Sequence, residues 1–132
     1  GNYGHPDHIQ VHRVGIRAAE LAAVTRVYES TVNRDHLVRL LAEAAELGLM
    51  EMRDIEGVDA TMGLPEAVLT TAVDVSAHLD AKRTAMAAHA SQIAENSFFL
   101  AMPPEAFAAA FSVEWYRRRD VTPAERETDL FS

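Results

Sequence analysis

Three short stretches rich in β-branched and aromatic residues alternate along this chain with segments of helical periodicity. They predict strands at Arg26–Val32, Thr70–Val75 and Val113–Arg117, because such side chains suit a pleated, half-buried surface. Strands that alternate with helices indicate the α/β class rather than a helical bundle or a β-sandwich. Three strands are fewer than a doubly wound sheet carries, so we expect the later part of a larger α/β domain.

Capping residues and apolar spacing predict two helices in the first part of the chain. His5 or Asp7 is expected to cap a helix that ends near Ala23, since proline follows His5 and apolar residues recur at helical intervals. Asn33 is expected to cap a second helix, which ends just before Gly48.

The later part of the chain predicts two more helices, one over Ser76–Ile93 and a short one over Ala106–Phe111 that follows two prolines. Scattered glycines and acids predict a long loop over Leu49–Pro65. We therefore expect residues 1–117 to form one portion of an α/β domain, and residues 118–132 to form a polar, mobile tail.

The composition excludes several classes of function. Twelve Lys and Arg against twenty Asp and Glu give a net charge of −8, which repels a phosphate backbone and argues against a nucleic-acid partner. No apolar run approaches the roughly 18 residues that a membrane span requires, and no signal segment opens the chain. The absence of cysteine excludes disulfides, thiolate zinc sites and cysteine nucleophiles, and a cytoplasmic setting is expected.

A cluster of side chains suited to metal or proton chemistry lies near the start of the sequence, and it comprises Tyr3, His5, Asp7, His8 and His12. The segment runs from a kinked loop into a helix, whose first amides favour anionic ligands. Neutral imidazole is a good zinc ligand, and His8 and His12 lie four apart on one helix face. Spacing alone leaves two readings equally open, a metal or acid–base site and a set of capping and surface histidines.

The string Tyr3-Gly4-His5-Pro6-Asp7-His8, followed by Ile9, Val11 and His12, resembles the second metal motif of the LmbE-like zinc deacetylases. This family contains the N-acetylglucosaminylphosphatidylinositol de-N-acetylases, mycothiol deacetylase and mycothiol conjugate amidase. A later stretch is similar to the family's Lys-Arg, Ala-His and Ser-Gln elements, at Asp80, Lys82, Arg83, Met86, His89, Ser91 and Gln92. The resemblance covers most of residues 2–117. It implies a Rossmann-like LmbE-type domain with a Zn²⁺ cofactor that deacylates an amino sugar or glycoside conjugate.

The resemblance also implies a role for each member of the motif. His8 would be a zinc ligand, contributed by the C-terminal part of the enzyme. His5 would be an imidazolium that stabilises the tetrahedral oxyanion or protonates the leaving amine, and Asp7 would keep it charged and oriented. Tyr3 would donate its hydroxyl to the substrate carbonyl or the oxyanion. These roles suit the chemistry, since preorganised donors stabilise charge that develops on oxygen.

One departure from the family pattern matters, because no AHPDDE-like string occurs in this chain. That motif supplies two further zinc ligands and the catalytic base, and a catalytic zinc takes three protein ligands. We therefore expect the C-terminal portion of an enzyme, inactive without the N-terminal half, with exposed apolar surface and self-association when isolated. Two alternatives stay open: a non-enzymatic α/β interaction fragment with structural histidines, and a metal-binding module that uses His5, His8 and His12.

Two further features carry weaker expectations. His89 is expected to pack beside Met86 and Ile93 on the third helix. The run Arg117-Arg118-Arg119 is expected to be solvated surface, with contact to an anionic substrate as the alternative.

Overall fold

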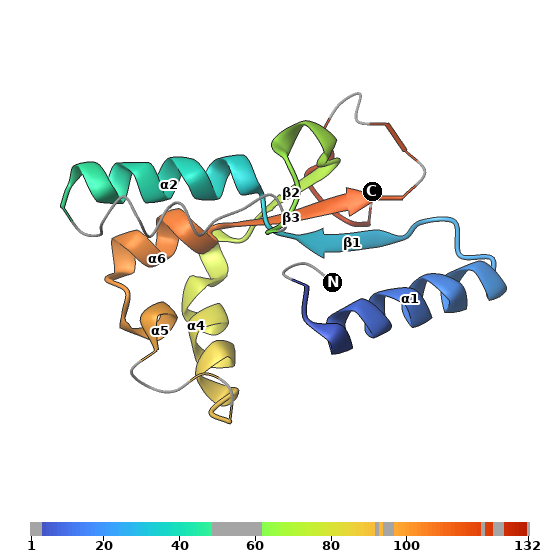
Figure 1. The fold of residues 1–132 in the computed structure, drawn as a ribbon, viewed down its shortest axis with the longest axis horizontal. Coiled ribbons are helices and arrows are strands. Elements are labelled where there is room, and N and C mark those ends of the chain that lie inside the picture. Colours follow the sequence, from blue (N-terminus) through green and yellow to red (C-terminus); the bar gives the residue numbers. More distant parts are fainter. Residues whose placement is uncertain are drawn as a thin grey trace. The chain divides into compact units, whose positions relative to one another are not determined.

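The computed structural model describes residues 4–48, 62–91, 93, 97–119, 121–122 and 126–131 (Figure 1). These residues form two compact units. The first unit combines the described residues up to Val73 with those from Trp115 onward, and the second unit is Asp74–Glu114. No described helix has both the length and the apolar composition of a membrane span.

Helix α1 spans Pro6–Leu21 and begins where the sequence predicts. His5 is its N-cap, and the φ of −62° and ψ of 129° at this residue are extended, as expected before a proline. Pro6 fits the first turn because the N–H that it lacks would have no partner within the helix. The helix ends slightly before the predicted Ala23, which adopts a positive φ of 53°. No residue of α1 is buried.

Three strands form one sheet in the order β1-β3-β2 (Figure 1). Their bounds are β1, Tyr28–Thr31; β2, Thr71–Asp74; and β3, Val113–Arg118. All three predicted strands are thus confirmed, each within two residues of its expected ends. The chain mixes helices with a small antiparallel sheet, which agrees with the expected α/β character.

The hydrogen bonds fix how the strands run. In the pairing of β1 with β3, Tyr28 lies opposite Arg118 and Thr31 lies opposite Trp115, so the two strands are antiparallel. The N–H of Thr70 donates to the carbonyl of Tyr116, while the later Val75 donates to the earlier Ser112. A later residue near β2 thus pairs with an earlier residue near β3. The two strands β2 and β3 are therefore also antiparallel.

Helix α2 spans Arg34–Glu46 and confirms the predicted cap, since the side-chain oxygen of Asn33 accepts a 3.0 Å hydrogen bond from the N–H of His36. Gly48 follows the helix with a φ of 70°, a conformation that glycine adopts without strain. Residues 49–61 of the expected loop lie outside the described residues. Beyond them, a short 3₁₀ helix, η1, spans Glu66–Val68.

In the second unit, a 3₁₀ turn, η2, at Ser76–His78 precedes helix α4 at Leu79–Ala88. The prediction of one helix over Ser76–Ile93 is therefore wrong at both ends. The first residues form a tighter turn, with the N–H of Ser76 bonded to the Asp74 carboxylate at 2.8 Å. The last two residues of α4, Ala87 and Ala88, and the C-cap His89 are exposed, so they provide no apolar burial that would extend the helix.

Two short helices complete the second unit: α5, Phe98–Ala101, and α6, Pro104–Phe111. The sequence predicts α6 but not α5. Phe107 on α6 is only 2% exposed. The Arg83 guanidinium lies 4.3 Å from the centre of the Phe107 ring and donates to the carbonyl of Met102 at 2.7 Å. Aromatic packing and one arginine from α4 thus hold these helices together.

The buried residues of the first unit that the structure describes are Asn33, Gly63, Leu69, Thr70 and Thr71. The last three lie at the start of β2, where this strand meets the C-terminal segment. The hydroxyl of Thr71 donates to the Glu127 carboxylate at 2.8 Å, and Arg118 pairs with the same carboxylate at 2.8 Å. Thr71 and Glu127 also form an isolated parallel bridge. Part of the segment that was expected to be a polar tail therefore lies against the sheet.

Candidate functional site

The start of α1 holds three of the four residues to which the sequence assigns a role in the site: His5, Asp7 and His8. Tyr3 lies outside the described residues. The Nδ1 atom of His5 accepts a 3.2 Å hydrogen bond from the backbone N–H of Asp7, which satisfies one of the helix's initial amides. The Asp7 carboxylate belongs to the first turn, where the helix dipole stabilises negative charge.

This hydrogen bond ties the His5 ring to the start of the helix, with Nδ1 facing the Asp7 N–H. The role that the resemblance implies for His5 stays a prediction.

His5 and His8 form a pair of neighbouring rings. Their centroids lie 5.1 Å apart with an angle of 46° between the planes, and both residues are exposed. His8 belongs to the first turn of α1, and the extended backbone of His5 brings the preceding ring back toward it. A ligand at the start of this helix could thus meet two imidazoles and the first helical amides together.

His12 belongs to a different group of side chains. Its Nδ1 lies 3.7 Å from the Glu29 carboxylate on β1, and Arg119 donates to that carboxylate at 3.0 Å. This arrangement turns His12 toward the sheet. Among the residues that the structure describes, no three His, Asp or Glu side chains are grouped closely enough to hold one metal ion. The described residues therefore do not form a complete catalytic zinc site, which takes three protein ligands.

Arg117, Arg118 and Arg119 have separate environments. Arg117 is exposed, as expected, whereas Arg118 pairs with Glu127 and Arg119 with Glu29. The expectation of a wholly solvated run is therefore wrong for two of the three arginines, because acidic partners from β1 and the C-terminal segment bind them. His89 is the exposed C-cap of α4, so the prediction that it packs within a helix is wrong as well.

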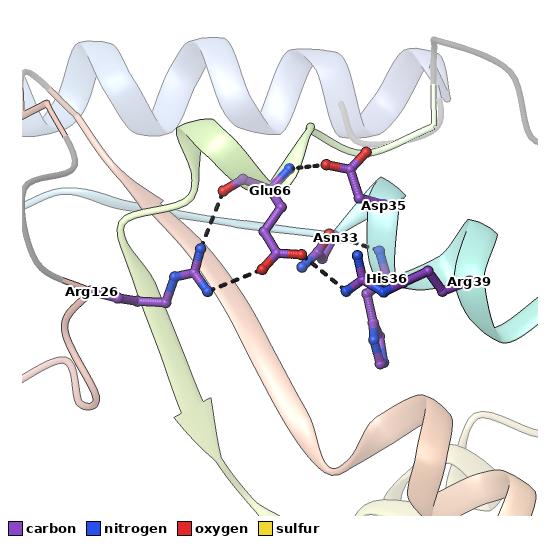
Figure 2. A network of polar contacts seen from close by, with 6 residues as sticks. All are labelled: Asn33, Asp35, His36, Arg39, Glu66 and Arg126. Carbon is purple, nitrogen blue, oxygen red and sulfur yellow. Dashed lines mark hydrogen bonds and ion pairs between the residues drawn. The ribbon is translucent and has the colours of Figure 1, made fainter.

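A second polar cluster, which sequence reasoning missed, is centred on Glu66 (Figure 2). Its carboxylate accepts hydrogen bonds from Arg39 at 3.0 Å and from Arg126 at 3.3 Å, while its backbone N–H donates to the Asp35 carboxylate at 2.8 Å. Only the cap at Asn33 could have been found from the sequence, because the other partners are far apart along the chain.

The charges of the Glu66 cluster compensate one another. Arg39, the Asn33 amide and Arg126 hold the pKa of the Glu66 carboxyl below its usual value, and partial burial opposes them. The Arg126 guanidinium also lies 5.3 Å from the centre of the Trp115 ring. The cluster joins α2, η1 and the C-terminal segment, so it acts as a structural clamp within the first unit.

Sequence comparison identifies relatives that match this chain from end to end. The chain is 39% identical over 142 aligned residues to the 1D-myo-inositol 2-acetamido-2-deoxy-alpha-D-glucopyranoside deacetylase of Acidothermus cellulolyticus, with 100% of the chain and 48% of the relative covered. The chain is 38% identical to the deacetylase of the same name from Streptomyces griseus, with 100% of the chain and 46% of the relative covered. It is 33% identical to that of a Nocardioides species, with 100% of the chain and 51% of the relative covered.

The chain spans about half the length of the curated relatives that it matches. No family model matches the chain. No solved structure matches it either.

Proposed function

Since this chain is homologous along its full length to the C-terminal half of the 1D-myo-inositol 2-acetamido-2-deoxy-alpha-D-glucopyranoside deacetylases of the LmbE family, we propose that it is part of a zinc-dependent N-deacetylase. The observation that carries this proposal is identity of 33–39% over the whole chain. The reaction is hydrolysis of an acetamide on an amino-sugar conjugate of the mycothiol-pathway type, in the cytoplasm. Water adds to the carbonyl carbon, the C–N bond breaks, and acetate and a free amine result.

In this proposal, the sheet and helices form the later part of a Rossmann-like domain. The remaining part corresponds to the half of the relatives' length that this chain does not match. That half would supply the further zinc ligands and the catalytic base. The absence of a three-ligand group among the described residues supports this division, because catalytic zinc sites use three protein ligands.

His8 is the residue of this chain that we assign to the metal. It is exposed in the first turn of α1, and its ring can reach an ion bound at the helix start. A zinc ion would supply a Lewis acid that activates water near neutral pH. The isolated chain, which offers one such imidazole, is expected to hydrolyse no amide.

His5, Asp7 and Tyr3 would act on the substrate rather than on the metal. The bond from the Asp7 N–H to Nδ1 of His5 holds the ring at the start of the helix. From there His5 would stabilise the oxyanion that develops on the acetamide oxygen or protonate the leaving amine. Asp7 would orient His5, and the Tyr3 hydroxyl would be a second donor to the same oxygen.

The proposal can be tested in a chimaera that joins the unmatched half of the Acidothermus cellulolyticus deacetylase to this chain. Zinc content is measured by elemental analysis, and acetate release is measured with the substrate named for that relative. We expect the chimaera to bind zinc and to release acetate. His8→Ala should lose zinc, whereas His5→Ala should keep zinc and lose roughly 10²–10³-fold in kcat.

The matched control is His78→Ala, which removes an exposed histidine of η2. This substitution should change neither the zinc content nor the rate of acetate release. An inert chimaera that holds zinc would overturn the proposed activity. If His5→Ala emptied the metal site while His8→Ala kept its zinc, the two histidine roles would be reversed.

A further inference from the structure

The C-terminal segment is fastened to the edge of the sheet by backbone hydrogen bonds. The N–H of Glu127 donates to the carbonyl of Thr70 at 2.8 Å, and the carbonyl of Glu127 accepts from the N–H of Ala72 at 2.9 Å. These two bonds make a parallel bridge between Thr71 and Glu127. Because the sheet order is β1-β3-β2, the segment pairs with the side of β2 that β3 leaves open. We call residues 126–131 the strap.

The carboxylate of Glu127 joins the strap to all three strands. It accepts a 2.8 Å hydrogen bond from Thr71 on β2 and another of 2.8 Å from Arg118 on β3. Tyr28 on β1 lies opposite Arg118, and burial together with the Glu127 carboxylate raises the pKa of the Tyr28 hydroxyl. The Glu127 and Arg118 side chains are 25% and 24% exposed, so water screens their attraction less than that of a fully exposed ion pair.

The neighbouring Arg126 fastens the strap to the opposite face of the sheet. Its guanidinium lies 5.3 Å from the centre of the Trp115 ring and donates to the Glu66 carboxylate at 3.3 Å (Figure 2). Trp115 and Arg118 are three positions apart on β3, so their side chains point to opposite faces. The side chains of Arg126 and Glu127 therefore hold the edge of the sheet from both sides.

The contacts of the strap with the sheet are concentrated at these two residues. The strap pairs with β2 through the isolated bridge between Thr71 and Glu127, whereas β1 pairs with β3 along the whole of Tyr28–Thr31. Farther along the strap, Phe131 is 94% exposed, and its N–H is bonded within the strap to the Asp129 carboxylate. A short attachment of this kind can open while the longer ladders of the sheet stay paired.

We infer that the strap is a separately opening unit that is latched by Glu127 and closes the outer edge of β2. Opening would leave the carbonyl of Thr70 and the N–H of Ala72 at an unpaired sheet edge, where another strand can pair. The closed strap thus protects this edge. This inference goes beyond the proposed function and does not depend on it, since it uses no residue of the site at the start of α1.

Hydrogen exchange of the backbone amides, followed by NMR in the full chain, tests the inference. The amides of Ala72 and Glu127 report opening of the strap, because each is bonded across the bridge. The amide of Thr70 donates to the carbonyl of Tyr116 at 3.1 Å and reports separation of β2 from β3. We expect Ala72 and Glu127 to have similar protection factors, roughly tenfold or more below that of Thr70.

Two variants weaken the latch to different extents. Glu127→Gln should lower the protection of the amides at positions 72 and 127 by roughly tenfold or more, because it removes the charge that strengthens two hydrogen bonds. Arg126→Gln should lower it only about two- to fivefold, since exposed ion pairs contribute little. Neither variant should change Thr70. The control Glu43→Gln alters the net charge equally on an exposed part of α2 and should leave all three amides unchanged.

The exchange pattern of the unmodified chain tests the inference even if Glu127→Gln fails to fold. Equal protection of Ala72, Glu127 and Thr70 would show that the strap and the sheet open together, and would overturn the inference. Unchanged protection of Ala72 in folded Glu127→Gln would show that this carboxylate is not the latch. A loss in Glu43→Gln as large as that in Glu127→Gln would assign the effect to net charge and would overturn the latch as well.

Discussion

The backbone N–H of Asp7 donates a 3.2 Å hydrogen bond to Nδ1 of His5. One ring atom thus caps the helix, while the imidazole itself is the group that the proposed reaction would use. The two contributions of His5 can be separated, because other side chains can cap a helix without offering an imidazole.

We predict that His5→Ala lowers the free energy of unfolding of the chain by about 0.5–1 kcal/mol, since it removes the cap. His5→Ser should restore that stability, because a serine oxygen can accept from the same N–H. Urea unfolding of the chain checks both values. In the chimaera, neither variant should recover full acetate release. Full activity in His5→Ser would show that the cap, not the ring, is what the reaction needs.

We predict that Glu66→Gln destabilises the first unit in a pH-dependent way. The pKa of Glu66 in the folded chain is lowered by Arg39, Asn33 and Arg126, so its ionised form stabilises the fold above the unfolded-state pKa of about 4.3. This contribution is lost as the pH falls through the lowered folded-state value. The difference between the two chains should be about 0.5–1 kcal/mol near neutral pH and should vanish in strong acid.

Urea unfolding at a series of pH values measures this difference. Glu43→Gln makes the same change of net charge on an exposed part of α2 and serves as the control. A Glu66→Gln difference that stays constant in acid would contradict the assigned role of the carboxylate.

We predict that Gly63→Ala costs about 2 kcal/mol or more, whereas Gly48→Ala costs about 1 kcal/mol. Both glycines have a positive φ, of 63° and 70° respectively, which disfavours alanine equally. A Cβ at Gly63 would also overlap the carbonyl of Val32, which accepts a hydrogen bond from the N–H of Leu64 at 2.9 Å. A Cβ at Gly48 meets no described atom within 4 Å. Thermal unfolding measures both losses of stability. If Gly63→Ala and Gly48→Ala lost the same amount, the Val32 carbonyl would have to move away from the new methyl group at little cost.

We predict that Thr71→Val lowers the free energy of unfolding by about 1–3 kcal/mol, as expected when a hydrogen bond to a charged group is lost from a buried position. Thr71 is 0% exposed, and its hydroxyl donates to Glu127. Thr71→Ser retains that hydroxyl and should recover most of the loss, apart from the missing methyl group. If Ser and Val variants unfolded alike, packing rather than the hydrogen bond would explain the cost.

Local sequence signals predict the parts of this fold that depend on neighbouring residues. Asn33 could be recognised as a cap because its partner, the N–H of His36, lies within one helical turn. The extended His5 follows from the next residue alone, which is proline. The three strands were found because β-branched and aromatic side chains concentrate in them.

Contacts between residues that are far apart in the sequence leave no such local signal. Glu127 belongs to a polar stretch, and nothing in its neighbours indicates that it would accept a hydrogen bond from Thr71, which is 56 positions away. The partners of Glu66 are similarly scattered over α2 and the C-terminal segment. For the candidate site, the sequence located His5, Asp7 and His8 through the resemblance of their motif, whereas the turn of His12 toward Glu29 required coordinates.

The central place of β3 in the sheet also has a consequence for synthesis on the ribosome. Both edge strands, β1 and β2, form their ladders with β3, which is made last. The Glu29 carboxylate on the edge strand β1 cannot accept its hydrogen bond until Arg119, which is 90 positions later, has been synthesised. Contacts of such high order slow folding, because a long loop must close before any pairing compensates for the lost entropy. The pairing of β1 and β2 with β3 should therefore form only after residue 113 has emerged, and truncation of this chain before β3 should remove both of these pairings.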